Sequence, residues 1–413
     1  MNTSRLLPNQ EPSRANALAQ LRAFIPKAGR AYTQFRNTDY GPAKNTAVSQ
    51  LSPFIRHRLI TEVEVLNAVL AHHRFHDAEK FVHEVFWRSY FKGYLEARPE
   101  IWQHYLAARD YHIEALARNS ALASDYNDAI TGKTGIDCFD AWVKELIETG
   151  YLHNHARMWF ASIWIFTLKL PWELGADFTL RYFLDGDPAS NTLSWRWVGG
   201  LHTKGKIYLA RSSNIEEFTN GRFSPKGLAT EASPLSEAPI ARSTPLDNKP
   251  LNIELSDPAL LLLTGEDLHP ESLECGKTNV QYIVGTHSAA ERSHLPVSPA
   301  VIDFSDGALN DALIRSQSYF KANYEAVRHL TADDLIQLAN QHNVKKIIMP
   351  HATVGPIADQ LPSIKLQLAE HMIELVSLTR QEDQRIWPHT KKGFFELKNH
   401  IPRILEDLAI QSR

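Results

Sequence analysis

Three chemically different side chains share one face of an expected helix in the segment FVHEVFWRSYF. Glu84, Trp87 and Arg88 stand at positions i, i+3 and i+4, and residues at this spacing are neighbours on a helix surface. A carboxylate, an indole and a guanidinium in one stripe are unusual for a face that only packs into a core. They indicate a binding face, although a salt-bridged and partly exposed helix explains this segment alone equally well.

The same spacing returns in GYLHNHARMWFASIWIF, where Asn154, Arg157 and Met158 share a helix face. An apolar helix that buries an amide and a guanidinium needs polar partners for them. LDGDPASNTLSWRWVGG offers such partners, and we expect Arg157 to pair with Asp185. Asp185 and Asp187 flank a glycine, so by themselves they are more typical of a turn or a helix cap. Their spacing is not that of an EF-hand loop, and no metal site is predicted.

Composition describes an ordinary soluble protein with a substantial core. The chain has 413 residues, of which 43% are hydrophobic and 22% charged, and this length suggests two or three domains. Its two cysteines, Cys138 and Cys275, are too few for a disulfide scaffold and fit a reduced, cytoplasmic protein. The first residues lack the apolar segment of a secretory signal. The most apolar window, 159–168, is about half of the roughly 20 residues that span a bilayer, so no membrane association is expected.

Charge is unevenly distributed along the chain. Residues 1–225 contain 26 Lys and Arg against 23 Asp and Glu, a balance of +3, whereas residues 226–413 contain 18 against 24, a balance of −6. A mildly basic first half permits a nucleic-acid partner but does not require one.

Periodicity divides the chain into two parts. Before about residue 222, apolar residues recur at helical spacing. After about residue 258, short apolar runs such as ALLLLTG, VQYIVG and VKKIIMP alternate with helical segments, which is typical of a parallel α/β sheet. The stretch between them is rich in Ser and Pro. We therefore predict a helical domain over 1–224, a linker over 225–257 and an α/β domain over 258–413.

Several segments together resemble the FAD-binding domain of the DNA photolyase and cryptochrome family. The hallmark is DGDxxxNxxxWxW over 185–197, preceded by HNxxRM over 153–158. The tyrosine of AYTQFR, the loop SQLSP, the helix EVFWRSYF and the segment KTGIDCFDA are also similar and occur in the family order. The resemblance covers about residues 14–223. It implies an all-helical, photolyase-type domain that binds FAD.

The resemblance also assigns cofactor contacts. It implies that four residues near the N-terminus hold the diphosphate region of FAD, that an ion pair flanks the isoalloxazine ring, and that an asparagine lies near flavin N5. The residues implied in FAD binding are Tyr32, Ser49, Leu51, Ser52, Arg88, Arg157, Asp185, Asp187 and Asn191. In such a site the flavin carries the electron chemistry, and the protein positions it and sets its electrostatics.

A second set of positions matches the pocket for cyclobutane pyrimidine dimers. The resemblance places Glu84, Asn154, Met158, Trp87 and Trp197 there, whereas enzymes for the (6-4) photoproduct carry histidine at the Asn154 and Met158 positions. A dimer flipped out of its stack needs aromatic walls. The resemblance implies a deoxyribodipyrimidine photo-lyase that repairs UV-damaged DNA under blue light. The alternative is a cryptochrome-like photoreceptor without repair activity, and a light-independent flavoprotein is a weaker third.

Several positions depart from the family pattern. The electron-transfer chain would begin at Trp195 and continue at Trp172, but its third position falls on Asn119. The arginine usual beside the lesion is His155. Photoreduction is separable from repair, so these departures leave repair open while favouring a photoreceptor.

Basic residues outside these motifs have two interpretations. The loop HTKGKIYLARSSN supplies Lys204, Lys206 and Arg211, the best candidates for contacts with the DNA backbone. Arg56 and Arg58 stand where relatives commonly carry a glycine. They either add phosphate contacts or belong to a solvated helix face, and we favour the second.

Domain order is the largest departure, because photolyases carry their α/β antenna domain before the FAD domain. Here LLLLTGEDLHPE is interpreted as the first strand and loop of an antenna-like domain, and RIWPHTKKGFFELKNHIPRIL as its closing helices. We expect a permuted arrangement. The sequence does not indicate a second chromophore or the oligomeric state.

Overall fold

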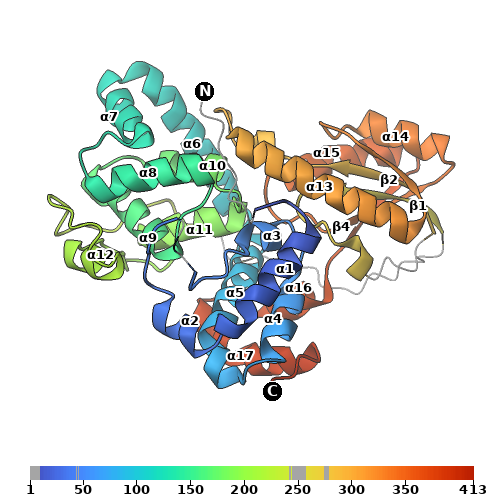
Figure 1. The fold of residues 1–413 in the computed structure, drawn as a ribbon. Coiled ribbons are helices and arrows are strands. Elements are labelled where there is room, and N and C mark those ends of the chain that lie inside the picture. Colours follow the sequence, from blue (N-terminus) through green and yellow to red (C-terminus); the bar gives the residue numbers. More distant parts are fainter. Residues whose placement is uncertain (1–9, 43, 45, 241–242, 244–256, 274–278) are drawn as a thin grey trace.

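The computed structural model describes residues 10–413 apart from 43, 45, 241–242, 244–256 and 274–278. Cys275 and much of the predicted linker lie outside the described residues. Figure 1 shows a helical part, from the N-terminal segment to α12, beside a sheet flanked by helices. Within the described part of the chain, no helix is both long and apolar enough to cross a bilayer.

In the part of the chain that the structure describes, twelve α-helices build the first part, and local signals set several of their ends. Thr61 and Glu64 form a capping box at the start of α4, Asp187 caps α11, and α8 stops at Gly150, whose φ of +65° favours glycine. The helices are α1 (Arg14–Phe24), α2 (Arg30–Phe35), α3 (Ser52–Arg56), α4 (Glu62–Leu70), α5 (Phe75–Glu96), α6 (Glu100–Arg118), α7 (Ser120–Thr131), α8 (Asp137–Thr149), α9 (Asn154–Ser162), α10 (Trp172–Tyr182), α11 (Pro188–Val198) and α12 (Ser212–Phe218).

Among the described residues, a five-stranded parallel sheet forms the second part, in the order β3-β2-β1-β4-β5. Its strands are β1 (Pro258–Thr264), β2 (Asn279–Thr286), β3 (Asn323–Ala326), β4 (Lys346–Pro350) and β5 (Glu374–Leu378), and its flanking helices are α13 (Pro299–Phe320), α14 (Ala332–Gln341) and α15 (Pro356–Glu370). Leu260 and Leu262 face the core under α14 and α15, whereas Leu261 and Leu263 face the core under α13. Both faces are therefore covered, as parallel sheets require, and the predicted fold class is confirmed.

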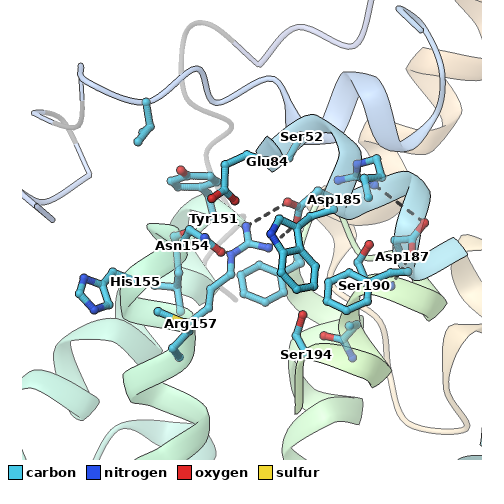
Figure 2. Close-up of a pocket in the computed structure, with 18 of the residues that line it drawn as sticks. Ser52, Glu84, Tyr151, Asn154, His155, Arg157, Asp185, Asp187, Ser190 and Ser194 are labelled. Atoms are coloured by element: carbon cyan, nitrogen blue, oxygen red, sulfur yellow. Dashed lines mark hydrogen bonds and ion pairs between the residues drawn. The ribbon is translucent and has the colours of Figure 1, made fainter. Parts of the chain in front are cut away.

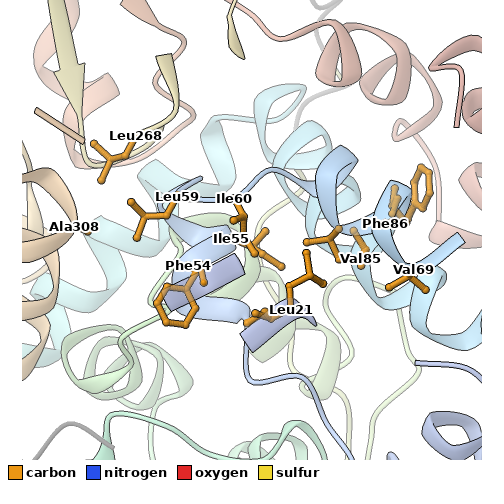
Figure 3. Close-up of a cluster of buried hydrophobic side chains, with 14 of the residues drawn as sticks. Leu21, Phe54, Ile55, Leu59, Ile60, Val69, Val85, Phe86, Leu268 and Ala308 are labelled. Atoms are coloured by element: carbon orange, nitrogen blue, oxygen red, sulfur yellow. The ribbon is translucent and has the colours of Figure 1, made fainter. Parts of the chain in front are cut away.

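One apolar core crosses the predicted domain boundary. Phe54 of α3 packs against Phe304 of α13, with ring centroids 5.8 Å apart. Figure 3 shows Leu268 and Ala308 of the α/β part beside side chains of the helical part. The two parts therefore share buried surface rather than meeting only through a connecting segment.

The C-terminal helices do not close the α/β part as expected from the sequence. α16 (Gln381–Ile386), the turn η6 (Trp387–His389) and α17 (Phe394–Asp407) pack against α5, and Figure 1 shows α17 away from the sheet. The physical reason is that α13, α14 and α15 already cover both sheet faces. The apolar stripe of α17 is therefore buried against the helical part.

Candidate functional site

A cavity of about 450 Å³ opens between α5 on one side and α9 and α11 on the other. The loop over residues 48–52 also lines it. This volume falls in the range of small-molecule and cofactor sites. All the residues predicted for the cofactor and for the lesion line this single cavity, together with Trp195: Tyr32, Ser49, Leu51, Ser52, Glu84, Trp87, Arg88, Asn154, Arg157, Met158, Asp185, Asp187, Asn191 and Trp197. Their individual roles stay predictions.

The ion pair expected between Arg157 and Asp185 is present. Arg157 donates from Nη1 to Asp185 Oδ1 at 3.1 Å, and its Nη2 lies 3.0 Å from Oδ2, so the pair is bidentate (Figure 2). The guanidinium also lies 3.9 Å from the centre of the Phe183 ring. Burial raises the pKa of Asp185, but Arg157 and Ser52 outweigh it and lower that pKa below its ordinary value. Asp185 is therefore ionised at neutral pH and keeps Arg157 oriented.

Asp187 lies deeper in the cavity, between two cations. Its Oδ1 accepts the Ser190 backbone N–H at 2.7 Å, and its Oδ2 lies 3.9 Å from both Lys92 Nζ and Arg88 Nη1. Burial opposes its ionisation, but Lys92, Arg56 and Arg88 hold the pKa of Asp187 well below its usual range. Asp187 therefore caps α11, the role that the Asp-Gly-Asp motif alone favoured, and it also forms part of the cavity wall.

Two buried polar atoms of the cavity wall are available to a polar cofactor. Arg88 Nη1 and Ser190 Oγ are buried there, and neither has a hydrogen-bond partner among the described residues. Buried polar atoms are normally satisfied, so both are candidates to bond a bound molecule. Together with the guanidinium of Arg157, they fit the phosphates and ring edges of FAD.

Asn191 and Trp195 are tied together at the cavity wall. Thr179 Oγ1 donates to Asn191 Oδ1 at 2.9 Å and accepts the indole N–H of Trp195 at 3.0 Å. Asn191 Nδ2 donates to the Ala176 carbonyl at 2.8 Å. These bonds fix the amide of Asn191 in one orientation with respect to the cavity.

The residues predicted to contact a lesion form another part of the cavity wall. Glu84 accepts a hydrogen bond from the Arg36 guanidinium, and both side chains are about one quarter exposed. Asn154 is exposed at the start of α9, and the partly buried Trp197 packs against Tyr208 with ring centroids 5.7 Å apart. The cavity therefore combines aromatic walls with polar groups that reach solvent.

The predicted electron-transfer residues are placed differently. Trp195 lines the cavity, and its ring lies 6.1 Å from that of Trp164. Trp172 lies outside the cavity lining, and its ring lies 5.7 Å from that of Tyr105. Asn119, at the third position, caps α7 by accepting the Leu122 N–H. A helix cap thus occupies the place at which a third tryptophan is expected.

The predicted DNA contacts lie outside the cavity lining. Lys204, Lys206 and Arg211 are all exposed. His155, at the place of the usual arginine, stacks on Trp159 with centroids 4.0 Å apart, and its Nδ1 bonds the Asn37 carbonyl. Burial lowers its pKa, so it does not supply the missing positive charge at neutral pH.

Both interpretations of Arg56 and Arg58 are wrong. The two side chains are almost completely buried, and each binds a carboxylate that follows the linker in sequence. Arg56 makes a bidentate pair with Glu266 at 2.7 and 2.9 Å and donates to the Gly186 carbonyl. Arg58 pairs with Asp383 at 2.7 and 2.8 Å. Their partners are too distant in sequence for a local pattern to reveal them.

Among the polar residues at the site, the sequence analysis missed Arg36 and Ser190, which line the cavity, and the buried Lys92, which lies next to Asp187 without lining it. Helical spacing could have found Arg36 and Lys92. Arg36 follows Tyr32 by four residues, and Lys92 follows Arg88 by four, so each shares a helix face with a predicted residue. Ser190 lies inside the DGDxxxN motif and carries no such signal.

Comparisons with known proteins find relatives of the helical part of the chain. Residues 81–227 match the family model of the FAD-binding domain of DNA photolyase. A deoxyribodipyrimidine photo-lyase of Thermus thermophilus is 33% identical over 196 residues, which cover 47% of this chain and 44% of the relative. The enzyme of the same name from Streptomyces griseus is 32% identical over 163 residues, covering 38% and 33%.

Among solved structures, a bacterial class III photolyase from Agrobacterium tumefaciens aligns with a TM-score of 0.39 and 26% identity, over 51% of this chain and 43% of that one. The chain spans less than half the length of the curated relatives named above.

Proposed function

We infer that this chain, whose residues 81–227 carry the FAD-binding domain of the DNA photolyase family, repairs cyclobutane pyrimidine dimers in DNA under blue light. One observation carries the proposal. Residues chosen from widely separated sequence motifs, five for a lesion and nine for a cofactor, line the same cavity. FAD, when bound, supplies the light-absorbing electron donor.

The chain's own residues would bind and orient both molecules. Arg88, Arg157 and Ser190 hold the cofactor at the polar part of the cavity. Trp87 and Trp197 replace the stacking that a flipped dinucleotide loses on leaving the duplex. Glu84, oriented by Arg36, accepts hydrogen bonds from the pyrimidine edge.

A photoreceptor without repair activity is the second candidate. It is favoured by the helix cap at Asn119 and by His155, whose ring nitrogens both face partners within the protein: the Asn37 carbonyl and the Tyr208 hydroxyl. A lesion phosphate would therefore lack one expected cation.

Repair of a single-dimer oligonucleotide separates these candidates. The protein is loaded with FAD, chemically reduced and illuminated with blue light, and repaired strands are counted. Glu84→Ala and Trp197→Ala should each lower repair about fivefold or more, because a charged hydrogen bond and a stacking ring are worth roughly 1–3 kcal/mol. FAD absorbance should be retained in both.

Glu114→Ala and Tyr111→Ala, which change exposed residues of α6, are the matched controls. Wild-type protein with bound, reduced FAD that repairs nothing would favour the photoreceptor. Full repair by both pocket variants would refute the assignment of the lesion residues.

A further inference from the structure

A C-terminal segment, residues 387–395, is held firmly against α5 beside the cavity. A Cβ added at Gly93 would lie 2.5 Å from Trp387 Cδ1 and 2.7 Å from Thr390 Oγ1, so glycine is needed for this close approach. Phe394 stacks on Trp87 with ring centroids 3.9 Å apart and planes 9° from parallel. Trp87 itself lines the cavity, so the segment adjoins the cavity wall.

Tyr90 connects this segment to the basic loop that follows Trp197. The Tyr90 hydroxyl donates to the Lys392 carbonyl at 2.9 Å, and the same oxygen lies 3.0 Å from His202 Nε2. Arg98 also donates to the carbonyl of Lys391 at 2.5 Å. Residues 391–392 and the loop beginning at His202 are therefore neighbours, although almost 200 residues separate them in the sequence.

The neighbouring segments expose cations and one aromatic ring. We call Lys204, Lys206, Lys391, Lys392 and Phe395 the rim surface; all five are exposed. Phe395 is 81% exposed, the highest value among the large hydrophobic side chains of the described residues.

Two carboxylates lie close to the rim surface and compensate only part of its charge. Glu396 Oε2 is 3.3 Å from Lys392 Nζ, and Glu79 Oε1 is 3.5 Å from Lys398 Nζ. Among the described residues, Lys204, Lys206 and Lys391 have no carboxylate within 4.0 Å, so three of the four lysines of the rim surface carry a charge without an ion-pair partner.

We propose that the rim surface is a DNA-contact surface continuous with the cavity, with its lysines on backbone phosphates and Phe395 stacked on a base that flanks the bound dinucleotide. Exposed aromatic rings among lysines suit an unstacked, anionic strand better than a protein partner. Phe395 is one residue away from Phe394, which stacks on Trp87, so it is close to the cavity wall. The proposal rests on the proposed function, because it takes DNA as the occupant.

Equilibrium binding in the dark tests it. A fluorescent oligonucleotide with one cyclobutane dimer, and the same oligonucleotide undamaged, are titrated at several salt concentrations with FAD-loaded full-length protein. The variants are K391A/K392A and Phe395→Ala. The control is K365A/L366A, which changes an exposed lysine and an exposed hydrophobic residue of α15. FAD absorbance and thermal unfolding midpoints verify that each variant is folded.

K391A/K392A should weaken binding to both oligonucleotides and reduce the slope of log affinity against log salt by up to about 2, since each phosphate contact contributes about 0.7–0.9. Phe395→Ala should weaken binding about fivefold or more and leave that slope unchanged. The control should match the wild type.

If both variants bind the oligonucleotides as tightly as the wild type does, the rim surface does not contact DNA, and the proposed function is unaffected. Weakened binding in both variants, without any preference of the wild type for damaged DNA, would support the rim surface and count against the proposed function. A wild-type chain that binds neither oligonucleotide would overturn both.

Discussion

Buried charged side chains form two groups near α5, and the distances between opposite charges differ between the two groups. In the interface cluster, defined here as Arg56, Arg58, Glu266, Asp267, Arg380 and Asp383, ions of the helical part and of the C-terminal part meet at 2.6–3.2 Å. In the cavity, Asp187 lies 3.9 Å from both Arg88 and Lys92. Charged side chains that are largely hidden from solvent are thus closely paired in one region and loosely paired in the other.

The difference indicates what each region is built to bind. Closely paired ions have compensated one another's desolvation within the chain, so they hold the two parts in one arrangement. In the cavity, Arg88 lies farther from its carboxylate and has a buried N–H group without a hydrogen-bond partner among the described residues, so it is available to a bound molecule. Arg58 of the interface cluster also has one such N–H group, but its other nitrogens pair with carboxylates at 2.7–3.2 Å. Arg56 links the regions, since it binds Glu266 and also the carbonyl of Gly186 between the two cavity aspartates.

The largest loss of stability is expected when Arg58 is removed from the interface cluster. Arg58→Ala leaves Asp383, Asp267 and Glu62 buried without their shared cation. We expect the free energy of unfolding to fall by about 3–5 kcal/mol, measured by urea denaturation of the apoprotein.

The control for this prediction is Arg118→Ala. Arg118 belongs to an exposed pair with Glu114, so its loss should cost less than about 1 kcal/mol. Equal stability of the two variants would show that the interface cluster does not hold the parts together.

Removing a cavity cation should affect the cofactor instead of the fold. Arg88→Leu deletes the guanidinium with the unsatisfied N–H group, so apoprotein stability should change by less than about 1 kcal/mol. Affinity for FAD should fall about 10- to 100-fold, the loss expected for one hydrogen bond from a charged group. Fluorescence titration of apoprotein with FAD measures it, with Arg30→Leu at an exposed position as the control. A large loss of stability in Arg88→Leu with unchanged FAD affinity would show that Arg88 holds the fold and not the cofactor.

The same contrast explains how much the sequence could predict. Glu84 with Arg88, and Asn154 with Arg157, lie within single helices, so their spacing predicted which side chains share a face. The interface cluster could not be predicted in this way, because Arg58 and Asp383 are 325 residues apart. The sequence around an arginine that pairs with a distant carboxylate in the interior looks the same as the sequence around an arginine on a solvent-exposed helix face.

Packing choices set a second limit on prediction. The alternation of strands and helices predicted the parallel sheet, since each β–α unit is a local pattern. The amphipathic pattern of α17 predicted a helix but not the surface that would cover its apolar stripe. That depends on which faces other helices have already filled.

The smallest expected effect concerns Glu382, beside the interface cluster. Burial and the neighbouring charge of Asp383 raise its pKa to about 7, above the ordinary 4.5. The folded state therefore holds this proton to higher pH than the unfolded state. Protonation of Glu382 therefore contributes to the free energy of unfolding; this contribution is fully present below about pH 4.5 and is lost as pH rises toward 7.

Glu382→Gln removes this titration. The free energy of unfolding of the variant, relative to that of the wild type, should therefore increase with pH. Between pH 6 and pH 7 the difference should grow by about 1 kcal/mol, since one pKa unit corresponds to about 1.4 kcal/mol. Urea unfolding across this range measures it, and Glu370→Gln, at the exposed end of α15, should leave the wild-type profile unchanged. A constant difference between Glu382→Gln and wild type would mean that Arg380, 3.8 Å away, keeps Glu382 ionised throughout. The edge of the interface cluster would then be as fully paired as its centre.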